Sequence, residues 1–492
     1  MTEIKQKLIS GVVWESIGQF SSLGIQFIVT IVIARILTPA DYGVIGLLTV
    51  FVAIANILLD SGFSQALIQK KDAGELEFST VFFLNLTVGA LLYAILYVCS
   101  PYIARFYNIP DLTGYARILF LIIPVSSFGL IQNVIIQKYL QFKKSAIVSV
   151  SASLLSGLLG IWMAYAGYGI MALVIQQLSL SFIRTVLYTA LRRWKPTLKL
   201  SLAVIREMFA FSMNLMLHSL INTIMKNVYV LVIGKYYNSD EVGYYNQANR
   251  FENFSASTLT SVIMKVSFPT LVYFKDDLSR TKEAYKRIIE VTCFVIFPLM
   301  FLLICIAKPL FLLLLTEKWL PAVPYFQLLC LYGLTLPIMQ ISDNVYRLYK
   351  RGKLLVILDS VRHILFLLSI VMTIKYGISV LLIGQFLVMF GMSFVNMYYS
   401  GKLITYSVLE QIETILPYLI LAGLIGAVIW MIPASGSSLA DVCLDTILFV
   451  VGFLSLSGIF GLKAFKEFST ILRTFLRIKK DKKLKQALKQ MS

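Results

Sequence analysis

Apolar segments fill this chain almost from end to end. Roughly fourteen of them are about twenty residues long, the length that an α-helix needs to cross a bilayer. Hydrophobic residues make up 58% of the 492 residues and charged residues only 14%, whereas soluble domains carry about 25% charged residues. Because a backbone within lipid must satisfy its own hydrogen bonds, such segments form helices. The sequence therefore predicts an all-α, polytopic membrane protein with about 14 transmembrane helices.

The formal net charge of +19 raises the question of nucleic-acid binding. A nucleic-acid binder gathers its basic residues on one folded region, but here most of the 44 Lys and Arg cluster in every second loop. The clusters lie at 70–71, 138–144, 192–206, 275–287 and 347–353. This distribution follows the positive-inside rule, and an even number of spans places both termini in the cytoplasm. We expect no nucleic-acid partner.

No recognisable set of residues for metal binding or catalysis is present. The five cysteines are scattered without a C-x-x-C pair, so we expect neither disulfides nor a metal site. There is no Walker loop, and no outer loop exceeds about 15 residues, which leaves little scaffold for an external active site. We therefore expect no cofactor, no metal, no catalytic residues and no enzymatic activity.

An internal repeat is visible after the first and seventh expected spans. A cation, an acid and a glycine recur at the same offsets in residues 35–43 and 235–243. Because these spans have the same orientation, the pattern indicates a parallel repeat of two six-helix halves. We predict lobes at 1–200 and 201–402, two extra transmembrane helices at 403–462, and a basic cytoplasmic tail at 463–492 that begins amphipathic and lies on anionic lipid.

Three expected spans carry polar residues along one helical face. The residues are Glu15, Gln19, Ser22, Gln26 and Thr30 in the first, Asn214, His218, Asn222 and Lys226 in the seventh, and Asn246, Arg250, Asn253, Ser257 and Ser261, followed by Lys265, in the eighth. A polar face toward lipid is unfavourable, so each stripe meets another helix or water. Interhelical hydrogen bonds account for isolated Ser, Thr and Asn. The charged residues, which cost about 2.5–3.5 kcal/mol at mid-span, favour a hydrated cavity.

Further ionisable residues interrupt other spans. They are Asp60 in the second, Asp343 and Arg347 in the tenth, and Asp359, Arg362 and His363 in the eleventh. Residues three or four apart can pair along their own helix, so structural and functional roles remain equally open. Glu15, Asp60 and Asp343 are candidates for ion coupling or for the charge of a cavity.

Several motifs resemble those of a known family. They include Ala-Arg-Ile-Leu-Thr-Pro-Ala-Asp-Tyr-Gly at 34–43 and the segments at 9–14, 60–70, 137–142 and 317–319. The chain resembles oligosaccharide-lipid flippases of the multidrug/oligosaccharidyl-lipid/polysaccharide (MOP) superfamily. The nearest likeness is the branch of colanic-acid and teichuronic-acid exporters, which are lipopolysaccharide biosynthesis proteins. The resemblance covers about the first 400 residues, with its best motifs in about the first 145.

The resemblance implies two six-helix lobes that face each other across a central cavity, lined mainly by helices one, two, seven and eight. It also implies a substrate, an undecaprenyl-pyrophosphate-linked oligosaccharide, moved across the bacterial inner membrane by alternating access. The family has no single invariant set of catalytic residues. The site residues that we expect therefore come from the three stripes.

Charge assigns these residues to parts of the substrate. Lys226, Arg250 and Lys265 are expected to bind the pyrophosphate. The hydrogen-bonding partners of the sugar hydroxyls are expected to be Gln19, Gln26, Asn214, Asn222 and Asn253. Other expected partners are membrane lipid and a coupling ion, H⁺ or Na⁺. We expect a monomer, because one chain already holds both halves of the repeat.

Two alternatives remain. An ion-coupled drug antiporter of the same superfamily would need an acidic ion site, which Glu15, Asp60 or Asp343 could supply, but the intramembrane charge leans cationic. A membrane polysaccharide polymerase or glycosyltransferase would need a large outer loop or a cytoplasmic nucleotide-sugar domain, and neither is visible.

Overall fold

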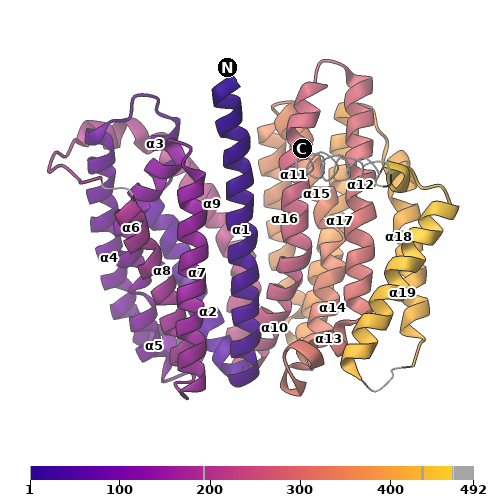
Figure 1. The fold of residues 1–492 in the computed structure, drawn as a ribbon, viewed down its shortest axis with the longest axis horizontal. Coiled ribbons are helices and arrows are strands. Elements are labelled where there is room, and N and C mark those ends of the chain that lie inside the picture. The colour runs from indigo at the N-terminus through magenta and orange to yellow at the C-terminus, as the bar shows by residue number, and fades with distance from the viewer. Residues whose placement is uncertain (1, 192–193, 434–436, 468, 470–492) are drawn as a thin grey trace, which may run out of the picture. The chain divides into compact units, whose positions relative to one another are not determined.

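The computed structural model describes residues 2–191, 194–433, 437–467 and 469, and within these ranges the chain is helical without a β-strand (Figure 1). Thirteen helices in the described part of the chain are long and apolar enough to cross a membrane. The expected eighth span instead forms α10 (Ser239–Glu252), a π-helical turn η1 (Asn253–Ser257) and α11 (Thr258–Tyr273). The predicted all-α membrane fold is confirmed, and the polar residues of the eighth span coincide with a change of helix type.

The chain divides into two compact units, Met1–Gln247 and Ala248–Ser492, and the division falls within α10. The first unit contains α1 (Thr2–Ile36), α2 (Pro39–Asp60), α3 (Phe63–Gln69), α4 (Glu75–Tyr107), α5 (Leu112–Leu119), α6 (Ile122–Lys138), α7 (Phe142–Tyr165), α8 (Ile170–Leu191) and α9 (Leu202–Tyr236). The second contains η1, α11, α12 (Leu278–Cys305), α13 (Ala307–Leu314), η2 (Glu317–Trp319), α14 (Ala322–Gly333), α15 (Leu336–Leu348), α16 (Gly352–Thr373), η3 (Ile374–Tyr376), α17 (Ile378–Ile404), α18 (Val408–Trp430) and α19 (Ser438–Ile459). The lobe boundary expected near residue 200 stays a prediction. The compact units divide later because α9 packs on α2, α3 and α4.

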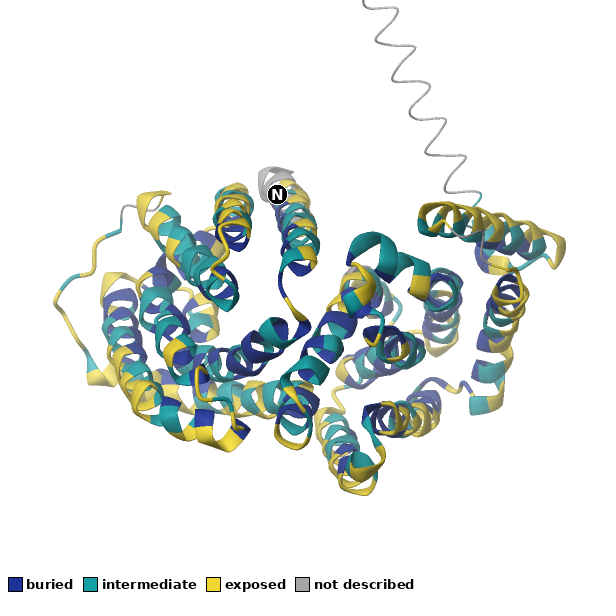
Figure 2. Ribbon diagram, turned by 90° about the horizontal axis from the view of Figure 1, so that it is seen from below, coloured by how far each residue is buried: buried dark blue, intermediate teal, exposed yellow. Residues whose placement is uncertain are grey.

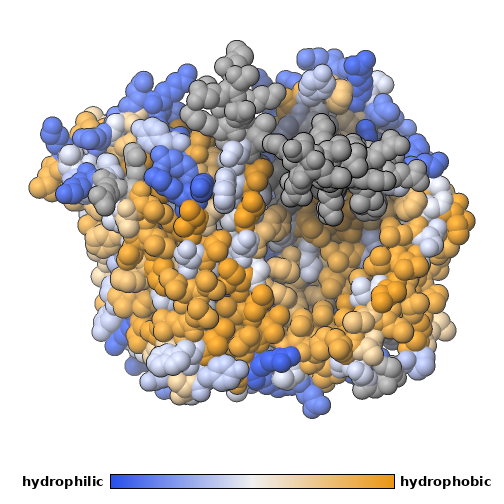
Figure 3. Space-filling view, in the orientation of Figure 1, coloured by the Kyte–Doolittle hydropathy of each residue, from blue (hydrophilic) through white to orange (hydrophobic). Residues whose placement is uncertain are grey.

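The outer surface of the helices is apolar. Figure 2 shows buried residues on the sides where helices meet their neighbours within each unit and exposed residues on the other sides. On α4, for example, Leu91, Val98 and Tyr102 are 60%, 65% and 66% exposed. Figure 3 shows this apolar surface along the middle of the helices and polar residues gathered at their ends. An apolar surface of this extent is one that a bilayer covers, so the chain is a multi-pass membrane protein.

Small residues bring α1 and α7 into close contact. A Cβ atom on Gly18 of α1 would lie only 2.6 Å from the Cβ of Ala146 on α7. Farther along the pair, a Cβ on Gly157 of α7 would overlap the side chain of Val29 on α1. Lipid offers no hydrophobic drive between helices, so close packing of small residues is what holds such a pair together. This contact fixes which face of α1 turns toward α7.

The helix starts that carry the sequence repeat pack against each other within the first unit. Each of α2 and α10 begins with a backbone N–H bonded to the side-chain oxygen of a polar residue just before the helix. A Cβ on Gly43 would overlap the carbonyl oxygen of Ser239, and a Cβ on Gly243 would overlap that of Pro39. The two glycines therefore serve equivalent places in a reciprocal crossing of backbones.

Two lysines of the predicted cytoplasmic loops hold the turn between α3 and α4. Lys138 Nζ donates to the carbonyl oxygens of Leu67 at 3.1 Å and Lys70 at 2.6 Å, which caps the end of α3. Lys70 Nζ in turn lies 2.9 Å from a Glu207 oxygen at the start of α9 and 3.3 Å from one of Glu77 on α4. The Glu207 carboxylate raises the pKa of Lys70. The basic cluster therefore ties α9 to α3 and α4.

Candidate functional site

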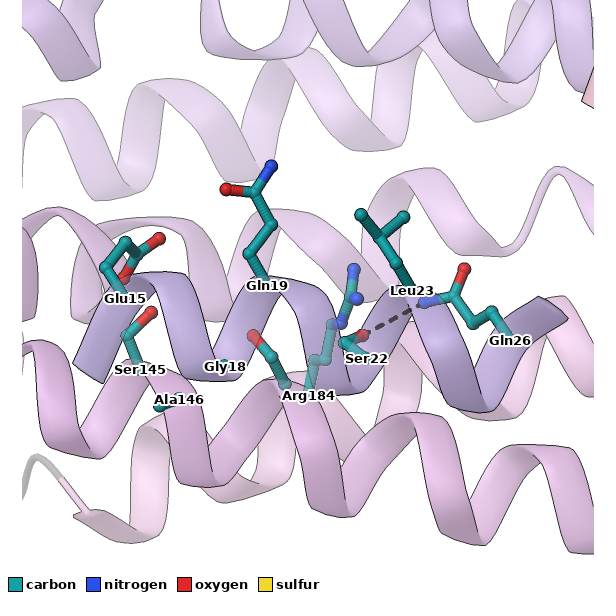
Figure 4. Close-up of a pocket in the computed structure, with 10 residues that line it drawn as sticks. Glu15, Gly18, Gln19, Ser22, Leu23, Gln26, Ser145, Ala146 and Arg184 are labelled. Atoms are coloured by element: carbon teal, nitrogen blue, oxygen red, sulfur yellow. Dashed lines mark hydrogen bonds between the residues drawn. The ribbon is translucent and has the colours of Figure 1, made fainter. Parts of the chain in front are cut away.

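A polar cavity of about 360 Å³ lies inside the first unit, between α1, α7 and α8 (Figure 4). Its polar lining consists of Glu15, Gln19, Ser22 and Gln26 from α1, Ser145 and Ser149 from α7, and Arg184 from α8. Four of the five residues of the stripe predicted on α1 thus line one cavity. The fifth, Thr30, is buried, and its backbone carbonyl accepts a hydrogen bond from the Tyr42 hydroxyl at 3.1 Å.

Hydrogen bonds between α1 and α7 form one wall of this cavity. The hydroxyl oxygens of Ser22 and Ser153 lie 2.6 Å apart, and Gln26 Nε2 donates to each of them at 3.1 Å. The interhelical bonding that the sequence left open is therefore present for Ser22 and Gln26. The same two residues also face the cavity, so packing and cavity lining are combined along one stripe.

Arg184 is a cavity residue that the sequence analysis did not single out. It lies in α8, and Figure 4 shows its side chain extending toward Ser22 on α1. Its Nε atom is buried without a hydrogen-bond partner, and its guanidinium makes no ion pair or hydrogen bond with any described residue. A signal was available, because Arg184 is the only charged residue between 169 and 191. An ionisable residue alone in an apolar span is a candidate for function.

Most of the polar stripe on α9 is exposed. Asn214, His218 and Lys226 are exposed, and α9 has no buried residue between Ser212 and Val228. Asn222 Nδ2 donates to the His218 carbonyl oxygen one turn earlier at 2.9 Å. Lys226 forms no ion pair or hydrogen bond with the described residues. Its assignment to the pyrophosphate remains a prediction.

The stripe of the eighth expected span runs through the π-helical turn: it begins in α10 before the turn and continues into α11 after it. Arg250 is exposed near the end of α10, and Asn253 Nδ2 donates to the backbone and side-chain oxygens of Asn249 at 2.8 and 2.9 Å. Lys265 belongs to α11, and its side chain lies outside the described side chains. Single π-helical turns within helices are frequent at functional sites. The substrate contacts of Arg250, Asn253 and Lys265 remain predictions.

A second residue that the sequence analysis did not select sits directly before this turn. Glu252 is only 2% exposed, and its Oε1 atom has no hydrogen-bond partner in the described part of the chain. A Cβ on Gly333 of α14 would lie 3.1 Å from that oxygen, so a glycine leaves the room that the carboxyl group occupies. In the sequence Glu252 is one more charged residue beside the polar stripe of the eighth expected span.

The two aspartates proposed for cavity charge have different surroundings. Asp60 Oδ1 accepts a bond from the Ser64 backbone N–H at 3.3 Å, at the turn from α2 into α3. Asp343 is partly buried on α15 and forms no ion pair with Arg347 in the structure. It lies within electrostatic range of Arg347 on the same helix and of Asp359 and Arg362 on α16.

The pairing that the sequence left open for the eleventh span is present. Asp359 Oδ1 lies 2.7 Å from a guanidinium nitrogen of Arg362, and both side chains are largely covered. Among the described residues, no group of three or more His, Cys, Asp and Glu side chains is arranged to hold a metal ion. The role of Asp343 in ion coupling stays a prediction.

The architecture matches that of solved membrane transporters. The lipid II flippase MurJ, in an inward closed conformation, superposes with a TM-score of 0.72 at 16% sequence identity, covering 91% of this chain and 98% of that chain. An inward-facing multidrug resistance MATE family transporter of the MOP superfamily superposes with a TM-score of 0.60 at 14% identity, covering 80% and 98%. The chain therefore has the fold of MOP superfamily transporters.

The sequence defines the family within this fold. The profile described as polysaccharide biosynthesis protein matches residues 32–324, and the chain belongs to this family. The teichuronic acid biosynthesis protein TuaB of Bacillus subtilis (strain 168) is 28% identical over 380 residues, which are 77% of this chain and 78% of that protein. The lipopolysaccharide biosynthesis protein WzxC of Escherichia coli (strain K12) is 28% identical over 333 residues, covering 67% and 68%. The resemblance drawn from the sequence motifs is confirmed.

Proposed function

We propose that this protein is a flippase that moves an undecaprenyl-pyrophosphate-linked oligosaccharide, the repeat unit of a surface polysaccharide, across a bacterial cytoplasmic membrane. The observation that carries the proposal is a polar cavity of about 360 Å³ among helices whose outer faces are apolar. Polar walls at membrane depth are stable only around water or a polar ligand. The polysaccharide biosynthesis family and the fold shared with a lipid II flippase support a lipid-linked sugar as that ligand.

The stripes supply the chemistry that this cargo needs. Cations at Lys226, Arg250 and Lys265 would bind the pyrophosphate, because charge-assisted hydrogen bonds are the strongest available to its oxygens. Amides at Gln19, Gln26, Asn214, Asn222 and Asn253 would bond to sugar hydroxyls. The exposure of Lys226 without a described partner supports this assignment, since a structural lysine at this depth would be paired.

Transport would proceed by alternating access, with the sugar and pyrophosphate in the hydrated interior and the prenyl tail in lipid. No covalent bond is made or broken, so no catalytic residue or cofactor is assigned. The positive-inside pattern places both termini in the cytoplasm, and one chain acts as a monomer. Glu15, Asp60 and Asp343 are the carboxylates that would bind a coupling H⁺ or Na⁺, with Asp60 also bonded to the backbone at the turn after α2.

Leaflet-resolved transport tests the proposal. The purified chain would be placed in vesicles with a fluorescent undecaprenyl-pyrophosphate oligosaccharide, and protection of the dye from an impermeant quencher would be followed. We expect movement in the wild type and a rate about a hundredfold lower in Lys226→Gln or Arg250→Gln. Arg206→Gln serves as the control, because Arg206 is exposed at the start of α9 and belongs to no stripe.

Two other results would assign a different function to the chain. If no lipid-linked sugar moves under any proton or sodium gradient while drug efflux is seen, the chain is a drug antiporter, and its fold is shared with a multidrug resistance transporter. Incorporation of labelled sugar into polymer by the purified chain would instead show a polymerase or transferase.

A further inference from the structure

The guanidinium of Arg184 lines the cavity of the first unit, and only the Tyr188 side chain on the same helix lies within electrostatic range of it among the described residues. Its Nε atom has no accessible surface, yet no described residue accepts a hydrogen bond or forms an ion pair with it. Guanidinium offers five N–H donors in a rigid plane and stays charged. Inside a membrane such a group needs an acceptor, and the cavity that Arg184 lines offers room for one.

The same cavity also holds a carboxyl group that Arg184 does not bind. Glu15 lines the cavity from α1, but the two residues form no ion pair. In a low-dielectric interior, opposite charges that are free to meet attract each other strongly. Because they form no ion pair, both groups line the cavity without neutralising each other. A ligand placed there meets a cation and a carboxyl group in one cavity.

The remaining walls are typical of a carbohydrate site. Ser145 and Ser149 add hydroxyl groups from α7, and Gln19 and Gln26 add side-chain amides from α1. Hydroxyl and amide groups both donate and accept hydrogen bonds, as sugar hydroxyls do. The volume of about 360 Å³ is near the lower end of small-molecule pockets, about 300–1,000 Å³, which suits a short piece of a glycan chain.

We infer that this cavity is a subsite for an acidic sugar of the transported oligosaccharide, with Arg184 binding its carboxylate and Glu15 accepting hydrogen bonds from its ring hydroxyls. The inference rests on the proposed function. A pyrophosphate fits less well, because its several negative charges would be repelled by Glu15 in the same small cavity. A planar carboxylate matches the bidentate geometry of guanidinium, and a hexuronic acid carries one such group beside several hydroxyls.

The location of Arg184 supports a role in sorting cargo. It lies seven residues before the end of α8 at Leu191, which is about 10 Å along a helix. That end is the one that the positive-inside pattern assigns to the cytoplasm. The sugar would therefore meet Arg184 from the side on which the lipid-linked unit is loaded, so acidic cargo would be favoured at entry.

Two matched lipids test the inference. Both are undecaprenyl-pyrophosphate disaccharides with the same inner sugar, and the outer sugar is glucuronic acid in one and glucose in the other. We expect the wild type to move the acidic lipid faster. Arg184→Gln should lower that rate about ten- to hundredfold, the effect of losing hydrogen bonds to a charged group, and leave the neutral lipid within about twofold. Arg184→Lys should restore part of the acidic rate, because it keeps the charge but loses the planar fork.

Two further variants separate the cavity from general effects. Arg206→Gln removes an exposed arginine outside the cavity and should change neither rate. Ser149→Phe keeps Arg184 but fills the space beside it, so it should also abolish the preference for the acidic lipid. If Arg184→Gln is not recovered as folded protein, the rates of Ser149→Phe with the two lipids test the inference instead.

The inference and the proposed function can fail separately. Equal rates for the two lipids in the wild type, or equal slowing of both by Arg184→Gln, would overturn the subsite while leaving the flippase intact. If neither lipid moves, the proposed function fails, and binding of methyl glucuronide against methyl glucoside to the detergent-solubilised full chain decides the cavity. Preference for the glucuronide that disappears in Arg184→Gln would support it, and no preference would overturn it.

Discussion

The helices α1 and α9 have the same length and a similar sequence pattern, yet they present their polar stripes in different ways. Each is 35 residues long, and each precedes a helix with a capped start and a crossing glycine. On α1 the stripe is bonded to α7 through Ser153 and lines a cavity. On α9 the corresponding stretch between Ser212 and Val228 has no buried residue.

The difference comes from the neighbour of each helix. Small residues on α7 let α1 approach closely, so its polar side chains reach hydroxyl partners instead of solvent. The contacts of α9 with α2, α3 and α4 bury its two ends and leave its middle open. A polar stripe in a membrane helix therefore does not by itself distinguish packing from function. The partner helix decides, and the charged residue without a partner is the one to test.

The largest expected effect is on the transport rate, through the exposed polar stripe of α9. Lys226→Gln should lower the transport rate about a hundredfold, because the loss of a buried charge contact with the cargo is worth roughly 2–5 kcal/mol. The amount of folded protein should be unchanged, since Lys226 is exposed and bonded to no described residue. The measurement is the quenching assay with equal protein per vesicle. A wild-type transport rate in this variant would show that the exposed stripe on α9 does not bind the cargo, and that α1 and α9 differ only in how they pack.

The next largest effect is on the free energy of unfolding, through the close packing of α1 against α7. Gly18→Leu should destabilise the protein by about 1–3 kcal/mol, because the new side chain must displace α7. Gly24→Leu on the same helix is the matched control, since a Cβ there has no neighbour within 4 Å. Thermal unfolding in detergent should separate the two variants by several degrees. Equal melting temperatures would show that the close contact between α1 and α7 is not what holds α1.

A smaller effect is expected from single hydroxyl groups. Ser153→Ala removes the partner that Ser22 and Gln26 share and should cost about 0.6–1 kcal/mol, the typical worth of such bonds between membrane helices. His218→Ala on α9 should change stability by less than about 0.5 kcal/mol, because the ring is exposed. Both changes are measured by the shift in unfolding midpoint. A larger loss for His218→Ala would mean that the stripe on α9 is also structural.

The sequence predicted the features that depend on helical periodicity. The spacing of Glu15, Gln19, Ser22 and Gln26 placed them on one face, and all four line one cavity. The number and length of apolar segments likewise predicted the helical membrane fold. Periodicity works here because a transmembrane helix is regular, so residues three or four apart must share a face.

The features that the sequence could not predict depend on contacts between distant segments. The sequence marks Arg184 only as the single charged residue of its span, and no repeating pattern shows that it lines a cavity with residues of α1. Glu252 is one of several polar or charged residues in the eighth expected span, and only its burial beside Gly333 distinguishes it from the others. The bond between Ser22 and Ser153 joins residues 131 positions apart, and no local pattern encodes which serine of α7 would meet α1.

The smallest expected effect is on the free energy of unfolding, through the ion pairs that join the start of α9 to its neighbours. Lys70→Gln removes the ion pairs to Glu207 and Glu77 and should destabilise the protein by only about 0.2–1 kcal/mol, because Glu207 is well exposed to solvent. Lys71→Gln is the matched control, since Lys71 is exposed and unpaired among the described residues.

The ion pair also makes this stabilisation depend on pH. The Glu207 carboxylate raises the pKa of Lys70, so the stabilisation is complete below the ordinary lysine pKa of about 10.4 and is lost as pH rises through the raised value. Wild type and Lys70→Gln should therefore differ in unfolding midpoint at neutral pH and converge in strong alkali. A difference that persists unchanged at high pH would show that Lys70 acts through the packing of its stem, and that the start of α9 is held by contact rather than by charge.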